Sequence, residues 1–356
     1  MNVSRLRSQL YDHVRASSIA SIVVAVKACA GETWEYCKGY SDANSRVPMK
    51  AGDRFLIYSL TKTFIAAAVL KLADTRLIDL DAPFASYLSN VPYSSEFSTR
   101  QLLNHTSGVP DYGVLPEYHA VVKQRGVHPW SFQEFIERTL LKGLSFEPGK
   151  GWAYSNIGYM LLSRLIEEVT RQELGSAMTS LIFRPLALDQ TFFMTRREQM
   201  YELVAGQSFN VAGQSFNLSI ADGVADARGF YDPGWVAHGV IASTAKDVAT
   251  FYHELLKGRL LSAATLEQMR KLIDVKSSHP PFVRPSYGLG LMADPEYLLG
   301  AIYGHTGEGP GYCGAAYHLC PNEGLAITVS ALCNSEEAKA VEVLVLDLLE
   351  MAYVKF

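Results

Sequence analysis

The sequence contains few cysteines, and their spacing argues against a disulfide framework and against a cysteine-ligated metal. The five stand at Cys29, Cys37, Cys313, Cys320 and Cys333, an odd number with no C-x-x-C pair among them. We therefore expect reduced thiols buried in the core.

Long apolar runs and dense basic clusters are also missing. No stretch approaches the length of a transmembrane helix, and residues 1–10 lack the apolar core of a signal peptide. These absences favour the cytoplasm, whereas a periplasmic or extracellular location stays open if an export signal has been removed. Lys and Arg number 32 against 36 Asp and Glu, so we expect no nucleic-acid partner.

Two common hydrolase signatures are absent. None of the nine histidines forms H-x-H or H-E-x-x-H, which argues against a metal hydrolase. No G-x-S-x-G pentapeptide occurs, although an α/β-hydrolase needs one after a strand. We expect neither a metal nor another cofactor.

The chain is long and apolar enough for a large globular fold. It has 356 residues, of which 48% are hydrophobic, including 16 Phe and 19 Tyr. Strand patterns occur near both ends, at residues 19–27, 33–40 (joined to the first at Ala30-Gly31), 312–319 and 325–332. Helical patterns adjoin them or fill the middle, at residues 3–14, 64–80, 131–141, 157–170, 246–257, 264–275 and 335–353.

These patterns predict an α+β fold, with one antiparallel sheet flanked by the terminal helices and a helical subdomain inserted between its strands. We expect residues 1–58 and 288–356 to form the discontinuous α/β subdomain. Residues 59–287 should form the mainly helical subdomain, with the active site between the two. A tandem heptapeptide, residues 204–210 and 211–217, is predicted to be a loop duplication without a catalytic role.

The first candidate for chemistry is Ser59, followed by Lys62 at the start of the buried helix. Positions i and i+3 share a helix face, so the lysine can reach the serine hydroxyl. Backbone N–H groups at a helix N-terminus also favour developing negative charge. A helix cap followed by a surface lysine gives the same pattern, and Ser243-Thr244-Ala245-Lys246 repeats it. We interpret that second copy as a cap.

The second candidate is Tyr154-Ser155-Asn156, the only Y-x-N in the sequence. A tyrosine has an ordinary pKa near 10, so it acts as a base at neutral pH only beside a cation such as Lys62. The alternative is a packed aromatic residue with Asn156 as the N-cap of the next helix.

The third candidate is His305-Thr306-Gly307, which follows an apolar stretch and precedes Gly309-Pro310-Gly311. Glycines let the backbone approach a ligand closely. By itself the tripeptide is also typical of an ordinary strand end, with the histidine on the surface.

In this order, the three motifs resemble those of the serine β-lactamase and penicillin-binding-protein superfamily. The similarity is greatest to the class C β-lactamase-like branch, which includes DD-peptidases, D-stereospecific peptidases and family VIII carboxylesterases. It runs from about residue 19 to the last helix, with H-T-G in place of the commoner K-T-G. The resemblance implies a β-lactamase/transpeptidase-like fold and a structural role for His105, which lies in Leu102-Leu103-Asn104-His105-Thr106-Ser107-Gly108.

The resemblance also implies roles for the motif residues. Ser59 would be the acylated nucleophile, Lys62 and Tyr154 would together accept and return its proton, and Asn156 would orient the substrate or the lysine. Which of the two is the base stays open. The backbone N–H groups of Ser59 and Glu308 would form the oxyanion hole.

His305, Thr306, Gly307 and Glu308 are the other predicted substrate-binding residues. Glu308 departs from the family pattern, because relatives usually have a small residue there, and its carboxylate would repel acidic substrates. A histidine with an ordinary pKa near 6.5 is mostly neutral at pH 7.5, so we expect His305 to gain charge toward pH 6 and then hold the carboxylate of a penicillin.

The predicted function is therefore a serine hydrolase of an ester, an amide or a β-lactam. The alternative is a protein on the same fold that binds penicillins or cell-wall fragments without turnover. The substrate would be a small molecule or a short peptide, held among the loops at residues 110–126, 194–234 and 277–287. The oligomeric state stays open.

Overall fold

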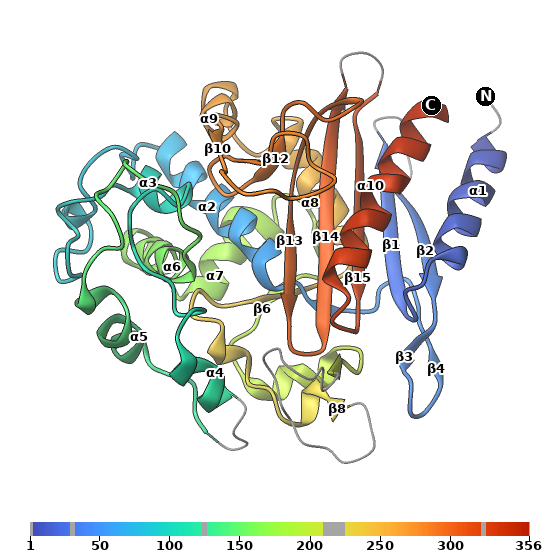
Figure 1. Ribbon diagram of the computed structural model, residues 1–356, viewed down its shortest axis with the longest axis horizontal. Coiled ribbons are helices and arrows are strands. Elements are labelled where there is room, and N and C mark those ends of the chain that lie inside the picture. Colours follow the sequence, from blue (N-terminus) through green and yellow to red (C-terminus); the bar gives the residue numbers. More distant parts are fainter. Residues whose placement is uncertain (1–2, 29–32, 123–126, 209–224, 322–324, 356) are drawn as a thin grey trace.

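The computed structural model describes residues 3–28, 33–122, 127–208, 225–321 and 325–355. Its largest feature is an eight-stranded antiparallel sheet in the order β10-β11-β12-β13-β14-β15-β1-β2 (Figure 1). The strands are β1 (Ile22–Ala28), β2 (Thr33–Lys38), β10 (Ile273–Asp274), β11 (Ser286–Tyr287), β12 (Met292–Asp294), β13 (Gly300–Gly309), β14 (Tyr312–Pro321) and β15 (Ile327–Cys333). β1 pairs with β15 along its whole length, so the two ends of the chain form one antiparallel sheet, as predicted.

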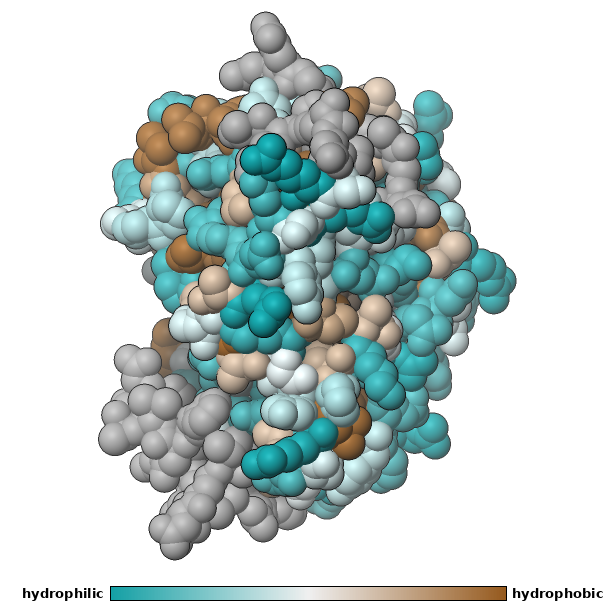
Figure 2. Space-filling view, turned by 90° about the vertical axis from the view of Figure 1, so that its right-hand side faces the viewer, coloured by the Kyte–Doolittle hydropathy of each residue, from teal (hydrophilic) through white to brown (hydrophobic). Residues whose placement is uncertain are grey.

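Helices cover both faces of the centre of this sheet. α1 (Val3–Ala16) and α10 (Ala338–Lys355) share one apolar cluster with the strands, and α8 (Ala245–Leu256) packs on β1, β14 and β15 from the other face. Because both faces are covered, Ile22–Val26 are buried in succession rather than in alternation. The face shown in Figure 2, which is the right-hand side of Figure 1, carries mostly hydrophilic side chains with apolar ones scattered among them.

The remaining helices gather beside the sheet (Figure 1). They are α2 (Thr61–Asp74), α3 (Thr99–Leu103), α4 (Pro116–Val122), α5 (Phe132–Arg138), α6 (Asn156–Thr170), α7 (Leu174–Met178) and α9 (Ala263–Met269). In the described residues, three small sheets lie outside the main one. They pair β3 (Tyr40–Asp42) with β4 (Val47–Pro48), β9 (Ile241–Ser243) with both β5 (Phe55–Leu56) and β6 (Phe192–Phe193), and β7 (Gln207–Ser208) with β8 (Ala225–Asp226). α2 is buried on nearly every side, as its sequence predicted, and it ends at Asp74, before Arg76 with a φ of 60°.

Several sequence predictions can be compared with this fold. The division at residues 58/59 and 287/288 stays a prediction; β10, β11 and α8 belong to the main sheet or its cover although their residues lie within 59–287. Thr244 caps α8 by accepting a hydrogen bond from Asp247 N, which confirms the second S-x-x-K pattern as a cap. Ala30-Gly31, Cys29 and most of the heptapeptide repeat lie outside the described residues.

The other four cysteines carry no disulfide; Cys313 and Cys333 are buried, whereas Cys37 and Cys320 are only partly buried. Within the described ranges, no helix combines the length and the apolar character needed to cross a membrane.

Candidate active site

Ser59 stands in a short 3-10 turn, Tyr58–Leu60, between β5 and the start of α2. It is the one residue from Phe55 to Leu70 that is not fully buried. Tyr58 before it has a φ of 43°, in the left-handed region that L-residues rarely adopt, and its hydroxyl donates to Pro310 O at 2.7 Å. The turn therefore exposes the Ser59 hydroxyl while its neighbours are held in the core.

Lys62 lies beneath Ser59 with its side chain fully buried. Its Nζ is 3.0 Å from Ser59 Oγ, 2.6 Å from Asn156 Oδ1 and 3.3 Å from His238 Nε2. Burial lowers the pKa of Lys62 from 10.5 to about 7, and the Asp111 carboxylate partly opposes this by favouring the ammonium form. Close to neutral pH, the amine is thus available in both protonation states.

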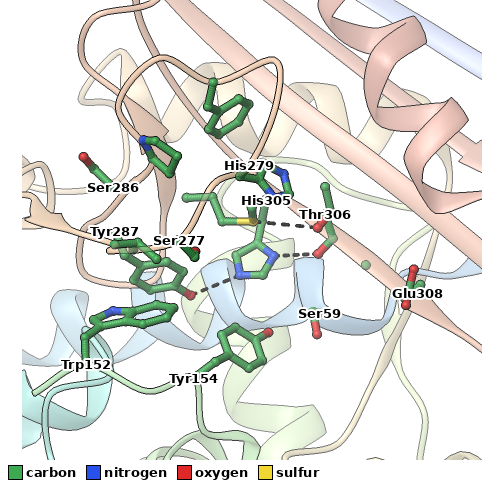
Figure 3. Close-up of a pocket in the computed structure, with 15 residues that line it drawn as sticks. Ser59, Trp152, Tyr154, Ser277, His279, Ser286, Tyr287, His305, Thr306 and Glu308 are labelled. Carbon is green, nitrogen blue, oxygen red and sulfur yellow. Dashed lines mark hydrogen bonds between the residues drawn. The ribbon is translucent and has the colours of Figure 1, made fainter.

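Tyr154 completes the surroundings of the serine. Its hydroxyl is directed toward Ser59 (Figure 3), and Lys62 Nζ lies 4.8 Å from the centre of its ring. Burial raises the pKa of Tyr154 above its ordinary value, more than the interaction with Ser59 lowers it. The phenol therefore stays protonated at neutral pH, even though a cation lies beside it.

Asn156 is the first residue of α6 and not its N-cap. Ser155 caps the helix through its Oγ, which accepts from Gly158 N, and so the alternative interpretation of Asn156 as a cap is wrong. The Asn156 side chain instead accepts from Lys62 and donates through Nδ2 to Asp111 Oδ2 at 3.2 Å. It links the amine to a carboxylate.

The predicted structural role of His105 agrees with its contacts. The ring is 1% exposed, and its centre lies 4.5 Å from that of Tyr154. Nδ1 accepts a hydrogen bond from Ser155 N at 3.1 Å. His105 therefore supports the loop that carries Tyr154 and the start of α6.

Two residues at this site were not among the predicted ones. Asp111 accepts hydrogen bonds from both the backbone and the side chain of Asn156, and His238 contacts Lys62. Burial lowers the pKa of His238 well below its ordinary value, and the positive charge of Lys62 lowers it further, so the ring is neutral. Neither residue lies in a recognisable motif, because each is brought here by a loop distant in sequence from Ser59.

His305-Thr306-Gly307 and Glu308 all lie within β13, which passes directly beside Ser59. A Cβ atom placed on Gly307 would lie 2.2 Å from Ile57 O and 3.0 Å from Ser59 N. Only glycine allows this approach, so the strand and the nucleophile turn are in backbone contact.

The strand register directs the backbone of Glu308 toward the serine. Gly309 and Tyr312 flank a two-residue turn and therefore form a hydrogen-bonded pair. Hydrogen-bonded and non-hydrogen-bonded pairs alternate along an antiparallel ladder, so the next pair, Glu308 and Cys313, is not hydrogen-bonded. Glu308 therefore directs its N–H away from β14. β12 ends opposite Gly304 and does not cover that side. This leaves the Glu308 N–H available beside Ser59 N.

His305 differs from the expectation drawn for it. Its Nδ1 is 2.5 Å from Thr306 O, which can only accept, so Nδ1 carries the proton and Nε2 accepts from the Tyr287 hydroxyl at 3.0 Å. Burial lowers the pKa of His305 to about 3, and the nearby Lys62 adds to the shift. The side chain is 1% exposed. The expected gain of charge near pH 6 is therefore wrong, and so is a surface position.

Ser59 and Glu308 lie where two pockets meet. The first, of about 410 Å³, we call the apolar pocket; it is lined mainly by Trp152, Tyr154, Val275, Phe282, Tyr287 and Met292. In Figure 3 Trp152, Tyr154, Tyr287 and His305 lie on one side of Ser59, and Glu308 lies on the other. The second, of about 550 Å³, we call the tyrosine pocket; it is lined by Tyr58, Tyr112, Tyr118, Tyr231, His119, His238 and Glu336 among others.

The predicted pocket loops contribute to both pockets. Residues 277–287 line the apolar pocket, and residues from 110–126 and 194–234 line the tyrosine pocket. Among the described residues, no group of three or more His, Cys, Asp or Glu side chains could hold a metal ion.

Comparisons with known proteins agree with this geometry. The chain is 27% identical to penicillin-binding protein 4* of Bacillus subtilis over 77% of its own length and 60% of that protein. It is 29% identical to esterase EstB of Burkholderia gladioli over 50% of its length and 48% of that protein. Its structure matches the D-amino acid amidase of Ochrobactrum anthropi, solved with L-phenylalanine amide, with a TM-score of 0.81, 26% identity and coverage of 99% and 98% of the two chains.

The chain therefore spans about half to three fifths of these two curated relatives, but nearly all of the amidase chain. Residues 8–349 match the description of one family, Beta-lactamase, and they include every motif residue discussed above. The chain belongs to the Beta-lactamase family.

Proposed function

We propose that the protein is a serine hydrolase that cleaves esters and amides through an acyl-enzyme on Ser59. The observation that carries the proposal is the buried Lys62 amine, 3.0 Å from Ser59 Oγ, with a pKa of about 7. At pH 7 roughly half of such amines are neutral, compared with roughly one in a few thousand at the ordinary lysine pKa. A neutral amine can accept the proton of the serine as it attacks.

The proposed reaction begins when Ser59 Oγ forms a bond to the substrate carbonyl carbon and its proton passes to Lys62 Nζ. The carbonyl oxygen becomes negatively charged and accepts hydrogen bonds from the N–H groups of Ser59 and Glu308. As the tetrahedral intermediate collapses, the bond to the leaving group breaks. The leaving group takes the Tyr154 hydroxyl proton, which the Lys62 ammonium replaces. Water then attacks the acyl-enzyme by the same proton path, releasing the acid and restoring Ser59.

This scheme assigns Lys62 as the base and Tyr154 as the proton relay. Its support is electrostatic: burial disfavours charge on both residues, so Lys62 is partly neutral and Tyr154 remains a phenol. Asn156 would hold the amine in place, and Thr306 and Gly307 would shape the wall beside the nucleophile.

The names of similar proteins support an ester or amide substrate, since one is an esterase and one an amidase. We propose a small molecule or short peptide that fits the two pockets. The neutral His305 supplies no cation for a penicillin carboxylate, so β-lactams are the less favoured substrates. A cytoplasmic location stays a prediction, which cell fractionation would check.

The experiment is time-resolved mass spectrometry of the intact protein with p-nitrophenyl acetate, D-phenylalanine amide and benzylpenicillin. A transient acyl adduct that maps to Ser59, together with product release, is the expected result. Ser59→Ala should abolish both, and Ser243→Ala should leave both unchanged. A stable adduct without product would support the non-turnover alternative, and activity in Ser59→Ala would refute the assignment.

A further inference from the structure

One wall of the apolar pocket is a loop, residues 275–285, between β10 and β11. Ser277 and His279 of this loop are labelled in Figure 3; the loop residues that line the pocket are Val275, Ser277, His279, Phe282 and Pro285. All of residues 275–285 are described, none of them lies in a helix or strand, and Phe282 is the only buried one. A segment that buries so little apolar surface depends on other contacts to keep one position.

A buried carboxylate on α10, that of Glu342, holds the middle of this loop. His279 Nε2 lies 2.9 Å from Glu342 Oε1 and 3.1 Å from Oε2, and because an ionised carboxylate can only accept, Nε2 carries the proton. Lys339 Nζ donates to Glu342 Oε2 at 2.9 Å and also donates to Pro280 O. Two neighbouring residues of the loop are therefore attached to one turn of the helix.

Glu342 is itself held in place by the core. It is 2% exposed, and its Oε1 accepts a hydrogen bond of 2.8 Å from the hydroxyl of Tyr317, which is fully buried on β14. Burial alone would raise the pKa of Glu342, but its hydrogen bonds outweigh that effect and lower the pKa, so the side chain is an anion at neutral pH. Because a buried anion is costly without its partners, Glu342 favours the loop position in which His279 contacts it.

A second buried carboxylate holds the other end of the loop. Asp294 on β12 is fully buried and accepts hydrogen bonds from Val283 N at 2.6 Å and Arg284 N at 3.3 Å. These two donors belong to the backbone, whereas the donor to Glu342 is the side chain of His279. The contact between His279 and Glu342 can therefore be removed by substitution without releasing the other end of the loop.

The apolar pocket lies on the side of Ser59 from which the leaving group departs in the proposed reaction. Tyr154, whose hydroxyl proton passes to that group, is one of the residues that line this pocket. The leaving group must therefore lie in or beside the apolar pocket when its bond breaks. The walls, which include Trp152 and Tyr287, suit a bulky apolar leaving group.

We propose that Glu342 is a positioning residue that holds the 275–285 loop through His279 and so determines the preference of the enzyme for bulky apolar leaving groups. Among the described residues that line the two pockets, Glu342 does not occur, so it acts on the substrate only through the loop. This inference rests on the proposed hydrolase function.

The test compares two esters with the same acyl group, 2-naphthyl acetate and vinyl acetate, which differ in the size of the leaving group. Both form the same acetyl-enzyme, so damage to the catalytic residues lowers kcat/KM for both. Glu342→Gln should lower kcat/KM for 2-naphthyl acetate about tenfold, the effect of losing one hydrogen bond to a charged group, and should leave that for vinyl acetate within about twofold. The loss should appear in KM, because the loop positions the leaving group without contacting the reacting atoms.

His279→Phe keeps a ring in the pocket wall but removes the donor, and it should give a similar loss. The double variant should lose little more than either single variant, because both substitutions break one contact. Glu350→Gln is the matched control and should change neither rate: Glu350 lies on the same helix and accepts a hydrogen bond of 2.6 Å from the hydroxyl of Tyr297, outside the loop.

Equal losses on the two esters in Glu342→Gln, or losses that multiply in the double variant, would overturn the proposal. If Glu342→Gln does not fold, His279→Phe decides the question, and an unchanged preference between the esters in that variant would overturn the proposal as well. Hydrolysis of vinyl acetate by the wild type but not by Ser59→Ala separates these results from failure of the hydrolase, since only the role of Glu342 is then refuted.

Discussion

Asp111→Asn should move the acid limb of the pH–rate profile to lower pH. The Asp111 carboxylate lies behind Asn156 and favours the ammonium form of Lys62. Burial raises the pKa of Asp111, while its hydrogen bonds from Asn156 act in the opposite direction. Removing the ionised carboxylate takes away an attraction that holds the proton on Lys62, so the pKa of the amine falls further below about 7.

The size of the shift follows from Coulomb's law. The Asn156 amide separates Lys62 Nζ from the carboxylate through hydrogen bonds of 2.6 Å and 3.2 Å. For two unit charges roughly 7 Å apart at an effective dielectric constant of about 20, the interaction is about 2 kcal/mol. Since one pH unit is about 1.4 kcal/mol, the acid limb should move by about 1 to 2 pH units. The ratio of variant to wild-type kcat/KM should rise several-fold between pH 8 and pH 6. A uniform loss from disturbing Asn156 would cancel in this ratio.

The assay is kcat/KM for p-nitrophenyl acetate from pH 5 to pH 9, because neither the substrate nor its acyl group titrates there. Asp12→Asn on α1, far from the site, is the control and should leave the profile unchanged. An unshifted profile for Asp111→Asn, or a shift to higher pH, would show that Lys62 is not the titrating base.

Three other changes have definite expected outcomes. Gly307→Ala should lower kcat by about 10²–10³-fold, because its Cβ would intrude between Ile57 O and Ser59 N and displace an oxyanion donor. The control Gly229→Ala, whose Cβ would have open space around it, should leave kcat unchanged. An equal loss of kcat in both variants would contradict this reasoning. Lys62→Met should raise Tm, more at pH 6 than at pH 10. Because the pKa of Lys62 is lowered in the folded state, the buried ammonium costs stability below about pH 7, and this cost disappears as the pH rises to the ordinary lysine pKa of 10.5. A gain in Tm that does not depend on pH would exclude a lowered pKa for Lys62. His305 stays neutral from pH 8 to pH 6, so His305→Asn should leave the pH dependence of the KM for benzylpenicillin unchanged, whereas His305→Lys should lower this KM several-fold. A pH dependence of the wild-type KM that disappears in His305→Asn would refute the lowered pKa of His305.

The sequence predicted the features that depend on local spacing or on long apolar patterns. Ser59 and Lys62 are one helical turn apart, and their contact follows from that spacing alone. The terminal strands and helices have clear periodicity, so the single sheet could be predicted. Asp111 and His238 could not, because their roles arise only when separate loops fold against Lys62.

His305 shows a second limit of sequence reasoning. Its ordinary pKa follows from the residue type, but its actual pKa depends on burial between β13 and Tyr287. Nothing in the neighbouring residues indicates that burial. The charge of a histidine in a motif is therefore a property of the fold, and substrate preferences inferred from it change once the fold is known.

Glycine content explains why β13 was not among the strands predicted from the sequence. Its active-site end, residues 304–309, contains three glycines, which weaken strand propensity. Two of them are required by contact with the nucleophile turn: a Cβ on Gly307 would collide with Ile57 O, and one on Gly309 would lie 2.4 Å from the Tyr58 ring. Glycine lowers strand propensity where the backbone must approach Ser59. The strand pattern in the sequence is therefore weak in the segment of β13 that lies beside the nucleophile.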